Sequence, residues 1–244
     1  MSIIGNRDAY LSYRQGCSHG RQVAMDGRNM DLLTYTQGQR YGTILADPPW
    51  RFANNTGKMA PEHRRLHRYR TMALEDIKAL PVERCAADPA HLYLWVPNAL
   101  LREGMEVLDA WGFTYKSNLV WYKIRKDGGP DGRGVGFYFR NVTELILFGV
   151  RGKNARTLAP GRRQVNIVSS RKTFHSEKPG QFYDIIESCS YAPRLELFSR
   201  KGRLGWDQWG DEYAQRWVEV SEPLSGGNGA EEEIQPLVAM NQLR

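Results

Sequence analysis

Short runs of apolar, β-prone residues recur through the middle of the chain and predict the strands of a sheet. These runs are residues 41–46, 91–96, 114–124, 142–150 and 194–198. The first run, Tyr-Gly-Thr-Ile-Leu-Ala, stops at Asp-Pro-Pro, which predicts a buried strand whose carboxyl end opens into a loop. In open α/β sheets, ligands bind at that edge.

Helical signals separate these runs. Residues 71–80 begin with a threonine suited to an N-cap position, carry acids in the first turn and stop before a proline. The apolar residues of 98–111 share one helical face, Asn98 is the candidate N-cap, and Gly112 fits a left-handed C-cap. A proline suits the first turn of a third helix at 179–190. This alternation predicts an α/β fold, a doubly wound and mostly parallel sheet with helices on both faces.

The two ends of the chain depart from this pattern. Residues 1–40 are polar and are predicted to be an extension that packs on the core, whereas residues 41–215 form one folded domain. Residues 216–244 are rich in Ser, Gly, Glu and Pro, which is typical of a mobile acidic tail. A length of 244 residues fits one large α/β domain with such extensions.

Charge and cysteine content narrow the class of protein. A formal net charge of +7 attracts polyanions and makes nucleic acid a natural partner, although charge alone is equally typical of an ordinary soluble protein. The three cysteines form no Cys-x-x-Cys pair, which favours reduced thiols in a cytoplasmic protein. No apolar stretch reaches the ~20 residues of a membrane span, so we expect neither membrane insertion nor secretion.

The strongest chemical signal is Asp47-Pro48-Pro49-Trp50 at the end of the first strand. A carboxylate and a backbone carbonyl can hold both hydrogens of an aromatic amine and aim its lone pair at an electrophile. Two prolines stiffen the loop and lower the cost of that orientation. Trp50 offers a flat face on which an unstacked base can lie. The tetrapeptide by itself fits equally well a turn that ends a strand, with Trp50 as a core anchor.

A dense run of cationic and histidine residues follows this motif at positions 58–70. Its cationic and imidazole side chains are Lys58, His63, Arg64, Arg65, His67, Arg68 and Arg70. Cations beside a target base are well placed to contact phosphates. A solvated surface loop is the alternative.

From about Tyr41 to Tyr213 the chain resembles the adenine-N6 methyltransferase family that contains the catalytic subunit of the messenger-RNA N6-methyladenosine writer and its bacterial and phage DNA-modifying relatives. Besides the Asp-Pro-Pro-Trp motif, the landmarks are Tyr69-Arg70-Thr71-Met72, Val120-Trp121-Tyr122-Lys123, Arg140 with Glu144, His175-Ser176-Glu177-Lys178-Pro179 and Glu196-Leu197-Phe198-Ser199-Arg200. The resemblance implies a Rossmann-like methyltransferase fold, S-adenosylmethionine as cofactor, and direct transfer to the N6 amine of a flipped-out adenine in DNA. RNA as the substrate, or a non-catalytic scaffold that binds nucleic acid, are the alternatives.

The resemblance also implies roles for single residues. Asp47, Pro48, Pro49 and Trp50 receive the adenine. Further substrate contacts fall on Tyr69, Glu144, Arg64, Arg65, Arg68, Lys123 and Arg140. Cofactor contacts fall on Asp26, Asp47, Lys178, Phe198, Arg200, Asp211 and Glu212. The chain departs from its relatives at Gly210-Asp211-Glu212, where Gly-Asn-Glu or Gly-Asn-Gln is common. A solvated helix start for Lys178 and a core position for Phe198 stay open.

Two further sequence patterns resemble binding sites, but we do not expect them to bind a dinucleotide or a metal. Residues 132–136, Gly-Arg-Gly-Val-Gly, imitate a dinucleotide fingerprint but follow a glycine-rich stretch instead of a strand, and they lack its full spacing. His63, His67 and His175 lack carboxylate or thiol neighbours at ligand spacing, so we expect no metal. Family analogy suggests a homodimer as the assembly.

Overall fold

The computed structural model describes residues 31–52, 71–132, 138–172, 178–200 and 202–210. Seven strands form one sheet in the order β5-β3-β4-β2-β1-β6-β7. The strands are β1 (Tyr41–Ala46), β2 (Ala86–Val96), β3 (Thr114–Lys123), β4 (Thr143–Arg151), β5 (Ile167–Ser170), β6 (Arg194–Leu197) and β7 (Asp207–Trp209). The α-helices are α2 (Leu32–Thr36), α4 (Leu74–Lys78), α5 (Val82–Cys85), α6 (Leu101–Ala110) and α7 (Gly180–Cys189). Two 3₁₀ helices, η1 (Asn98–Leu100) and η2 (Ala159–Arg163), complete the described elements.

The sheet is mostly parallel, as the alternation of strands and helices predicts. β1 pairs in parallel with β2 and β6, and the outer pairs β3 with β5 and β6 with β7 are parallel as well. β4 alone runs against its neighbours β2 and β3. The start of β4 therefore lies at the same edge of the sheet as the carboxyl ends of the other strands.

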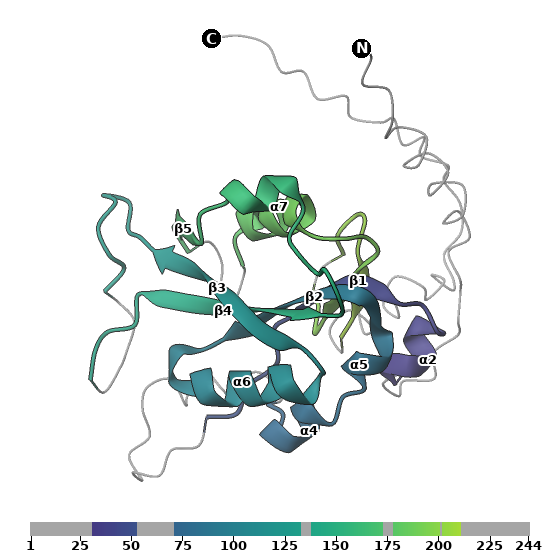
Figure 1. Cartoon of the computed structure of the whole chain (residues 1–244). Coiled ribbons are helices and arrows are strands. Elements are labelled where there is room, and N and C mark those ends of the chain that lie inside the picture. The colour runs from purple at the N-terminus through teal and green to yellow at the C-terminus, as the bar shows by residue number, and fades with distance from the viewer. Residues whose placement is uncertain (1–30, 53–70, 133–137, 173–177, 201, 211–244) are drawn as a thin grey trace, which may run out of the picture.

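Helices cover both faces of the sheet (Figure 1), and this explains the burial of the central strand. α4, α5 and α6 lie on one side, and α7 lies on the other. All six residues of β1 are buried; Ile44 and Ala46 pack into the core under α4 and α6, while Leu45 packs into the core under α7. A strand buried on both faces shows a continuous apolar run, which is the pattern seen in the sequence.

The order of connections makes the end of β1 the expected ligand-binding edge of the sheet. The chain passes from β1 to β2 through α4 and α5 on one face, and it reaches β6, on the other side of β1, through α7 on the opposite face. In doubly wound sheets, ligands bind where the connections diverge in this way, outside the carboxyl ends of the strands. Asp47 is the first residue beyond β1 at this point.

Two predicted helix starts are wrong, in both cases because a tertiary contact replaces a local cap. Thr71 caps no helix, since α4 begins only at Leu74 and Met72 N–H donates to Pro49 O at 2.9 Å. The Asn98 amide donates to the Thr143 carbonyl at 3.2 Å, and α6 begins three residues later. Gly112 does adopt the left-handed conformation expected of a C-cap, with φ +76°.

The sequence pattern also missed two short strands, β5 and β7, at the edges of the sheet. An edge strand contacts a neighbour on one side only, and β5 alternates between exposed and half-buried residues without an apolar run. At the amino end, Leu32 is 2% exposed and belongs to the core, although it lies in the segment predicted to be an extension. Residues 1–30 and 211–244 lie outside the described residues, so the predictions for them stay predictions.

Candidate active site

The loop that follows β1 is fixed by hydrogen bonds on both sides. Trp50 N–H donates to Pro48 O at 2.8 Å, and Pro49 O accepts the Met72 N–H. The Trp50 indole N–H donates to Trp95 O at 2.9 Å, which ties the loop to the end of β2. A carbonyl oxygen has two lone pairs, so Pro48 O keeps one acceptor site after bonding Trp50. The loop therefore presents the Asp47 carboxylate and the Pro48 carbonyl on a rigid frame.

The sequence left Trp50 open as a stacking face or a core anchor, and its ring lies in the core. Its residue exposure is 7%, and its ring belongs to the core on the α4 and α6 side of the sheet. A ring packed into a core and bonded through its N–H has little free face to offer a base. We therefore assign Trp50 to anchoring the loop, which is the second role that the sequence left open.

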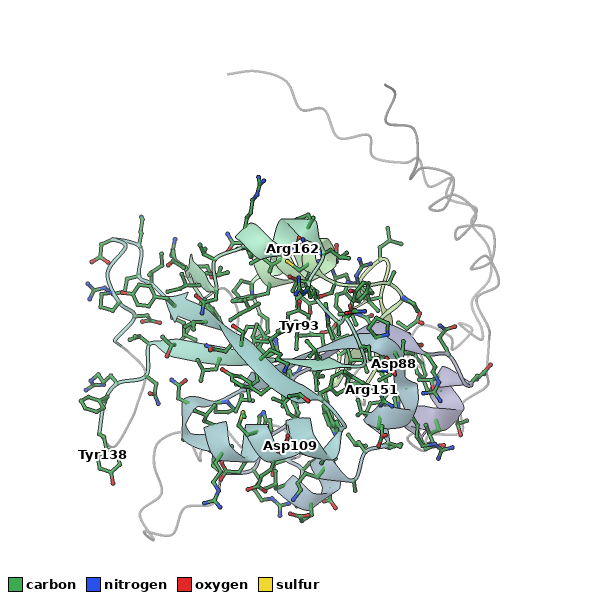
Figure 2. All side chains as sticks on the ribbon, in the orientation of Figure 1. Asp88, Tyr93, Asp109, Tyr138, Arg151 and Arg162 are labelled. Carbon is green, nitrogen blue, oxygen red and sulfur yellow. The ribbon has the colours of Figure 1, made fainter. Side chains whose placement is uncertain are left out.

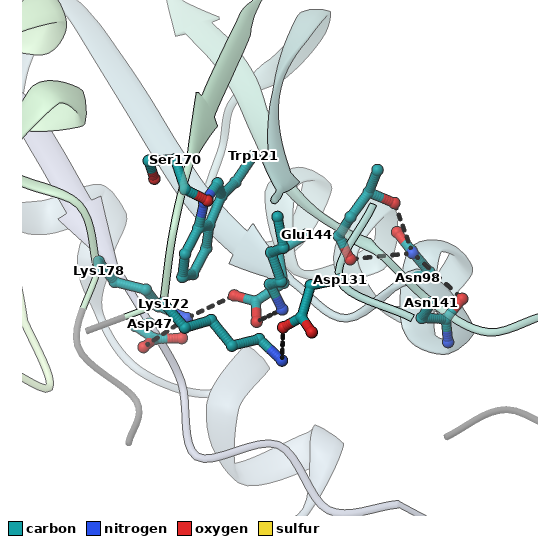
Figure 3. A network of polar contacts seen from close by, with 11 residues as sticks. Asp47, Asn98, Trp121, Asp131, Asn141, Glu144, Ser170, Lys172 and Lys178 are labelled. Carbon is teal, nitrogen blue, oxygen red and sulfur yellow. Dashed lines mark hydrogen bonds and ion pairs between the residues drawn. The ribbon is translucent and has the colours of Figure 1, made fainter. Parts of the chain in front are cut away.

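Among the described residues, four charged side chains converge at the carboxyl edge of the sheet and form what we call the charged cluster: Asp47, Lys123, Glu144 and Lys178. Figure 3 labels Asp47, Glu144 and Lys178. The Lys178 ammonium lies 3.3 Å from a carboxylate oxygen of Asp47 and 2.9 Å from one of Glu144. Lys123 pairs with the other oxygen of Glu144. Two cations and two anions thus alternate in one chain of contacts.

Strand periodicity explains how the cluster forms. Side chains two residues apart on a strand share a face. Lys123 lies on β3, Glu144 lies on β4, and Asp47 directly follows β1. They are two residues from Trp121, Ile146 and Leu45, and these three residues pack into the core under α7. The cluster is therefore the outward continuation of that core, and Lys178 reaches it from the residues that precede α7.

Two tryptophans form an aromatic floor beside the cations. The Lys178 ammonium lies 4.4 Å from the centroid of the Trp95 ring, and the Lys123 ammonium lies 4.9 Å from that of Trp121. The two rings meet edge to face at 6.3 Å. A cation over an indole face gains favourable electrostatic energy, which offsets part of its desolvation.

The pKa shifts distinguish the two carboxylates of the charged cluster. Burial raises the pKa of Asp47, Glu144 adds to the rise, and Lys178 and Arg200 only partly oppose it. Burial also acts to raise the pKa of Glu144, but Lys178 and Lys123 outweigh it and the pKa falls. Lys178 shows the mirror case, because its two carboxylates overcome burial and raise its pKa. Of the two carboxylates in the charged cluster, only Asp47 thus has a raised pKa.

The end of β6 lies beside the end of β1 and carries strained backbone. Phe198 has φ +62°, a left-handed conformation that is unfavourable for a bulky residue, and its ring meets Trp209 at 5.8 Å. A Cβ at Gly210 would lie 2.7 Å from backbone atoms of Ser199, so only glycine fits there. Glu196 is held by the Tyr183 hydroxyl at 2.8 Å and the Gln208 amide at 3.1 Å. Strain of this kind concentrates at functional sites.

The structure thus brings several predicted site residues together and leaves others apart. Phe198 is half-buried at the end of β6, and the charge of Arg200 acts on Asp47. Arg140 is exposed in the segment before β4. The remaining predicted positions lie outside the described residues: Asp26, Arg64, Arg65, Arg68, Tyr69, Asp211 and Glu212.

Sequence reasoning missed an ion pair of a buried carboxylate beside the charged cluster. Asp131 is 1% exposed, and the Lys172 ammonium lies 3.3 Å from its carboxylate (Figure 3). The pair joins the loop after β3 to the residues after β5. Nothing local in the glycine-rich sequence around Asp131 marks it as buried. Tyr138 and Phe139, 94% and 86% exposed, also lie at this edge of the sheet.

Neither a metal-binding group of side chains nor a membrane-spanning helix is found among the described residues. In residues 31–52, 71–132, 138–172, 178–200 and 202–210, no three His, Cys, Asp or Glu side chains are grouped to hold a metal ion. The histidines at 63, 67 and 175 lie outside these ranges. Among the described helices, none combines the length and apolar character that crossing a bilayer requires.

The doubly wound sheet, with an acidic loop at its switch point, defines a mixed α/β protein with a Rossmann-like methyltransferase fold. The MT-A70 family matches residues 41–212, and the chain belongs to this family. It is therefore a methyltransferase by family.

Curated relatives agree with this assignment. The chain is similar to the type II methyltransferase M.MunI of Mycoplasma sp, with 27% identity over 75% of this chain and 82% of that protein. It is 30% identical to an N(6)-adenosine-methyltransferase MT-A70-like protein of Drosophila melanogaster, over 81% of this chain. It is 28% identical to the N6-methyladenosine RNA methyltransferase MTA1 of Cryphonectria parasitica, over 73% of this chain. The matches span 29% of the Drosophila protein and 55% of the fungal one.

Proposed function

We propose that this protein transfers a methyl group from S-adenosylmethionine to the exocyclic N6 amine of adenine in DNA. The observation that carries the proposal is the position of Asp47, at the switch point of an MT-A70 domain and within 3.3 Å of the Lys178 ammonium. The side chain of Asp47 is 36% exposed, so an incoming amine can reach its carboxylate.

The loop itself supplies the groups that an aromatic amine needs. The Asp47 carboxylate accepts a hydrogen bond from one N–H of the amine, and the free lone pair of Pro48 O accepts a hydrogen bond from the other. Both acceptors are fixed before substrate arrives, because the hydrogen bonds of Trp50 and Met72 hold the loop. Preorganised hydrogen-bond partners of this kind are worth about 10²–10³ in rate. As the nitrogen forms its new bond, Asp47 is also placed to receive the proton that the amine loses.

The charges at the site fit the amino-acid end of S-adenosylmethionine. That end carries one ammonium and one carboxylate, and Asp47 and Lys178 present the opposite charges side by side. When bound, the cofactor supplies a methyl group on a sulfonium centre. Phe198 and Arg200, at the neighbouring end of β6, are the candidates to border it.

One comparison favours DNA, and the net charge of the chain fits either nucleic acid. The match covers 82% of the type II methyltransferase, against 55% of the fungal protein and 29% of the Drosophila one. The net charge of +7 suits a polyanion. The fungal relative, named an RNA methyltransferase, makes RNA the second candidate substrate.

The test uses the full chain with isotopically labelled S-adenosylmethionine and oligonucleotides of one sequence as duplex DNA, single-stranded DNA and RNA. We expect labelled N6-methyldeoxyadenosine after digestion and mass spectrometry. Label in N6-methyladenosine alone would transfer the proposal to RNA. If no nucleoside is labelled although calorimetry detects cofactor binding, the transfer reaction proposed here is wrong. Absence of both activities would favour a non-catalytic scaffold.

A further inference from the structure

One stretch of the chain carries cations and no acids. From Leu145 to Ser176 the sequence contains neither Asp nor Glu. Within it, a set of basic residues follows β4, and we call this set the basic segment: Lys153, Arg156, Arg162, Arg163 and Arg171. All five are exposed.

The basic segment differs from the opposite face of the sheet in lacking counter-ions. On that face, Lys78 pairs with Glu75 and Glu106, and Arg102 pairs with Glu106. Within the described ranges, no member of the basic segment has a carboxylate within ion-pair distance. Neighbouring cations such as those of Arg162 and Arg163 repel each other, and a bound polyanion removes this repulsion.

Hydrogen bonds and close packing against the end of α7 hold the backbone that carries these cations. Leu158 N–H donates to Cys189 O at 2.8 Å, which docks η2 on the end of α7. The Tyr191 hydroxyl donates to Arg156 O at 2.8 Å. A Cβ at Gly161 would lie 2.8 Å from the Cys189 sulfur, which shows how closely the two segments pack. A fixed backbone lowers the entropy lost when the side chains bind a ligand.

The basic segment leads to the charged cluster. η2 lies on the α7 side of the sheet, where Figure 2 labels its residue Arg162. β5 follows η2 in the chain, and its last residue, Ser170, is in register with Lys123. Arg171 follows at the same edge as Asp47. Arg171 lies eight positions after Arg163 in the chain, a span of at most ~30 Å. One turn of B-DNA is about 34 Å, so a single duplex can contact both ends of this surface.

We propose that the basic segment binds the phosphate backbone of duplex DNA on one side of the target adenine. The inference rests on the proposed function in taking nucleic acid as the substrate, but it assigns a surface of its own, at η2 and β5. Because phosphate contacts position a duplex without reading its sequence, the segment contributes affinity independent of the recognition sequence.

The test compares two triple variants that remove equal charge. Arg156→Gln/Arg162→Gln/Arg163→Gln alters the basic segment, and Lys78→Gln/Arg84→Gln/Arg102→Gln alters the opposite face. We expect the first variant alone to reduce the slope of log Kd for duplex DNA against log salt, by about 0.9 for each phosphate that its side chains no longer neutralise. Equal slopes for both variants and wild type, or equal reductions in both variants, would overturn the inference. Thermal unfolding midpoints check that each variant folds.

Duplex length provides a second test. With wild type, KM should fall when the duplex is extended from about 6 to about 20 base pairs, because the longer duplex reaches the basic segment. The first variant should lose this gain while kcat at saturating DNA stays unchanged, and the control variant should keep it. If the wild type shows no gain with length, or no affinity for duplex DNA, the inference fails. If salt-dependent binding requires the segment but no methyl group is transferred, the proposed function fails and the inference stands.

Discussion

Two polar clusters of the described residues occupy different parts of the sheet, and they are built from different chemistry. The charged cluster sits at the carboxyl edge of the sheet. The other, the neutral cluster, joins His91, Tyr93, Ser190 and the carbonyl of Ala155 toward the amino end of β1. There, Ser190 Oγ lies 2.8 Å from His91 Nδ1 and 2.7 Å from the Tyr93 hydroxyl. The other ring nitrogen of His91 lies 3.1 Å from Ala155 O.

The comparison indicates a structural role for the neutral cluster and a functional role for the charged cluster. His91 and Ser190 are 0% and 1% exposed, and burial lowers the pKa of His91, so its ring stays neutral and satisfied. The charged cluster holds four ionisable groups close together, with the side chain of Asp47 36% exposed. Replacing water around charges is costly unless they are paired, and retaining such a group at a sheet edge is typical of a functional site. We therefore expect mutations to affect activity at one cluster and stability at the other.

The largest effect is expected for Asp47→Asn. The amide keeps the shape of the side chain but removes the negative charge that receives the amine, so methyl transfer should fall about 10²–10³-fold. Stability should change little, because Lys178 still pairs with Glu144. Steady-state rates and the free energy of unfolding check both parts. Asp109→Asn, an exposed position on α6, is the matched control, and equal rates for the two variants would contradict the role of Asp47.

Lys178→Met should shift the pH dependence of activity. The carboxylate form of Asp47 is the active one, and its pKa is already raised, so activity should fall on the acid side at a pH above the ordinary Asp range. Loss of the Lys178 ammonium removes a charge that lowers this pKa, so the acid limb should move to higher pH. Profiles of kcat/KM against pH measure the shift. Lys178→Arg keeps a positive charge, so its acid limb should lie closer to that of wild type. If the acid limb of Lys178→Met coincides with that of wild type, Lys178 does not control the pKa of Asp47.

At the neutral cluster, His91→Leu should reduce stability by about 2 kcal/mol, because Ser190 and Ala155 O lose a partner in the interior. In the folded state the pKa of His91 lies below its unfolded value of 6.5, so wild-type stability is fully present above pH 6.5 and falls as pH decreases through it. The variant should lose this part of the pH dependence. Denaturant unfolding at pH 7.5, 6 and 5 tests it; an identical pH slope in both proteins would contradict a neutral, buried His91.

The smallest effect is expected for Tyr93→Phe, which removes one hydroxyl from the neutral cluster and should reduce stability by about 1 kcal/mol. Methyl transfer by the folded variant should stay at the wild-type rate. A large loss of activity without a loss of stability would erase the distinction between the two clusters.

Much of the sheet was predictable because its central strands are apolar on both faces. The runs of β1, β2, β4 and β6 are visible in the sequence, and so is the acidic loop after β1. Positions where a distant partner competes with a local signal were not predictable. Asn98 looks like a helix cap but bonds Thr143. The edge strands β5 and β7 have too few buried residues to form an apolar run.

The sequence by itself determined that an acidic, proline-stiffened loop would end a buried strand, because those properties are local. The tertiary structure decided what surrounds that loop. Lys123, Glu144 and Lys178 meet Asp47 only because β1, β3, β4 and the residues before α7 end at one edge of the sheet. It also placed Trp50 in the core, since a large aromatic ring next to a helix-covered sheet is more stable buried than exposed.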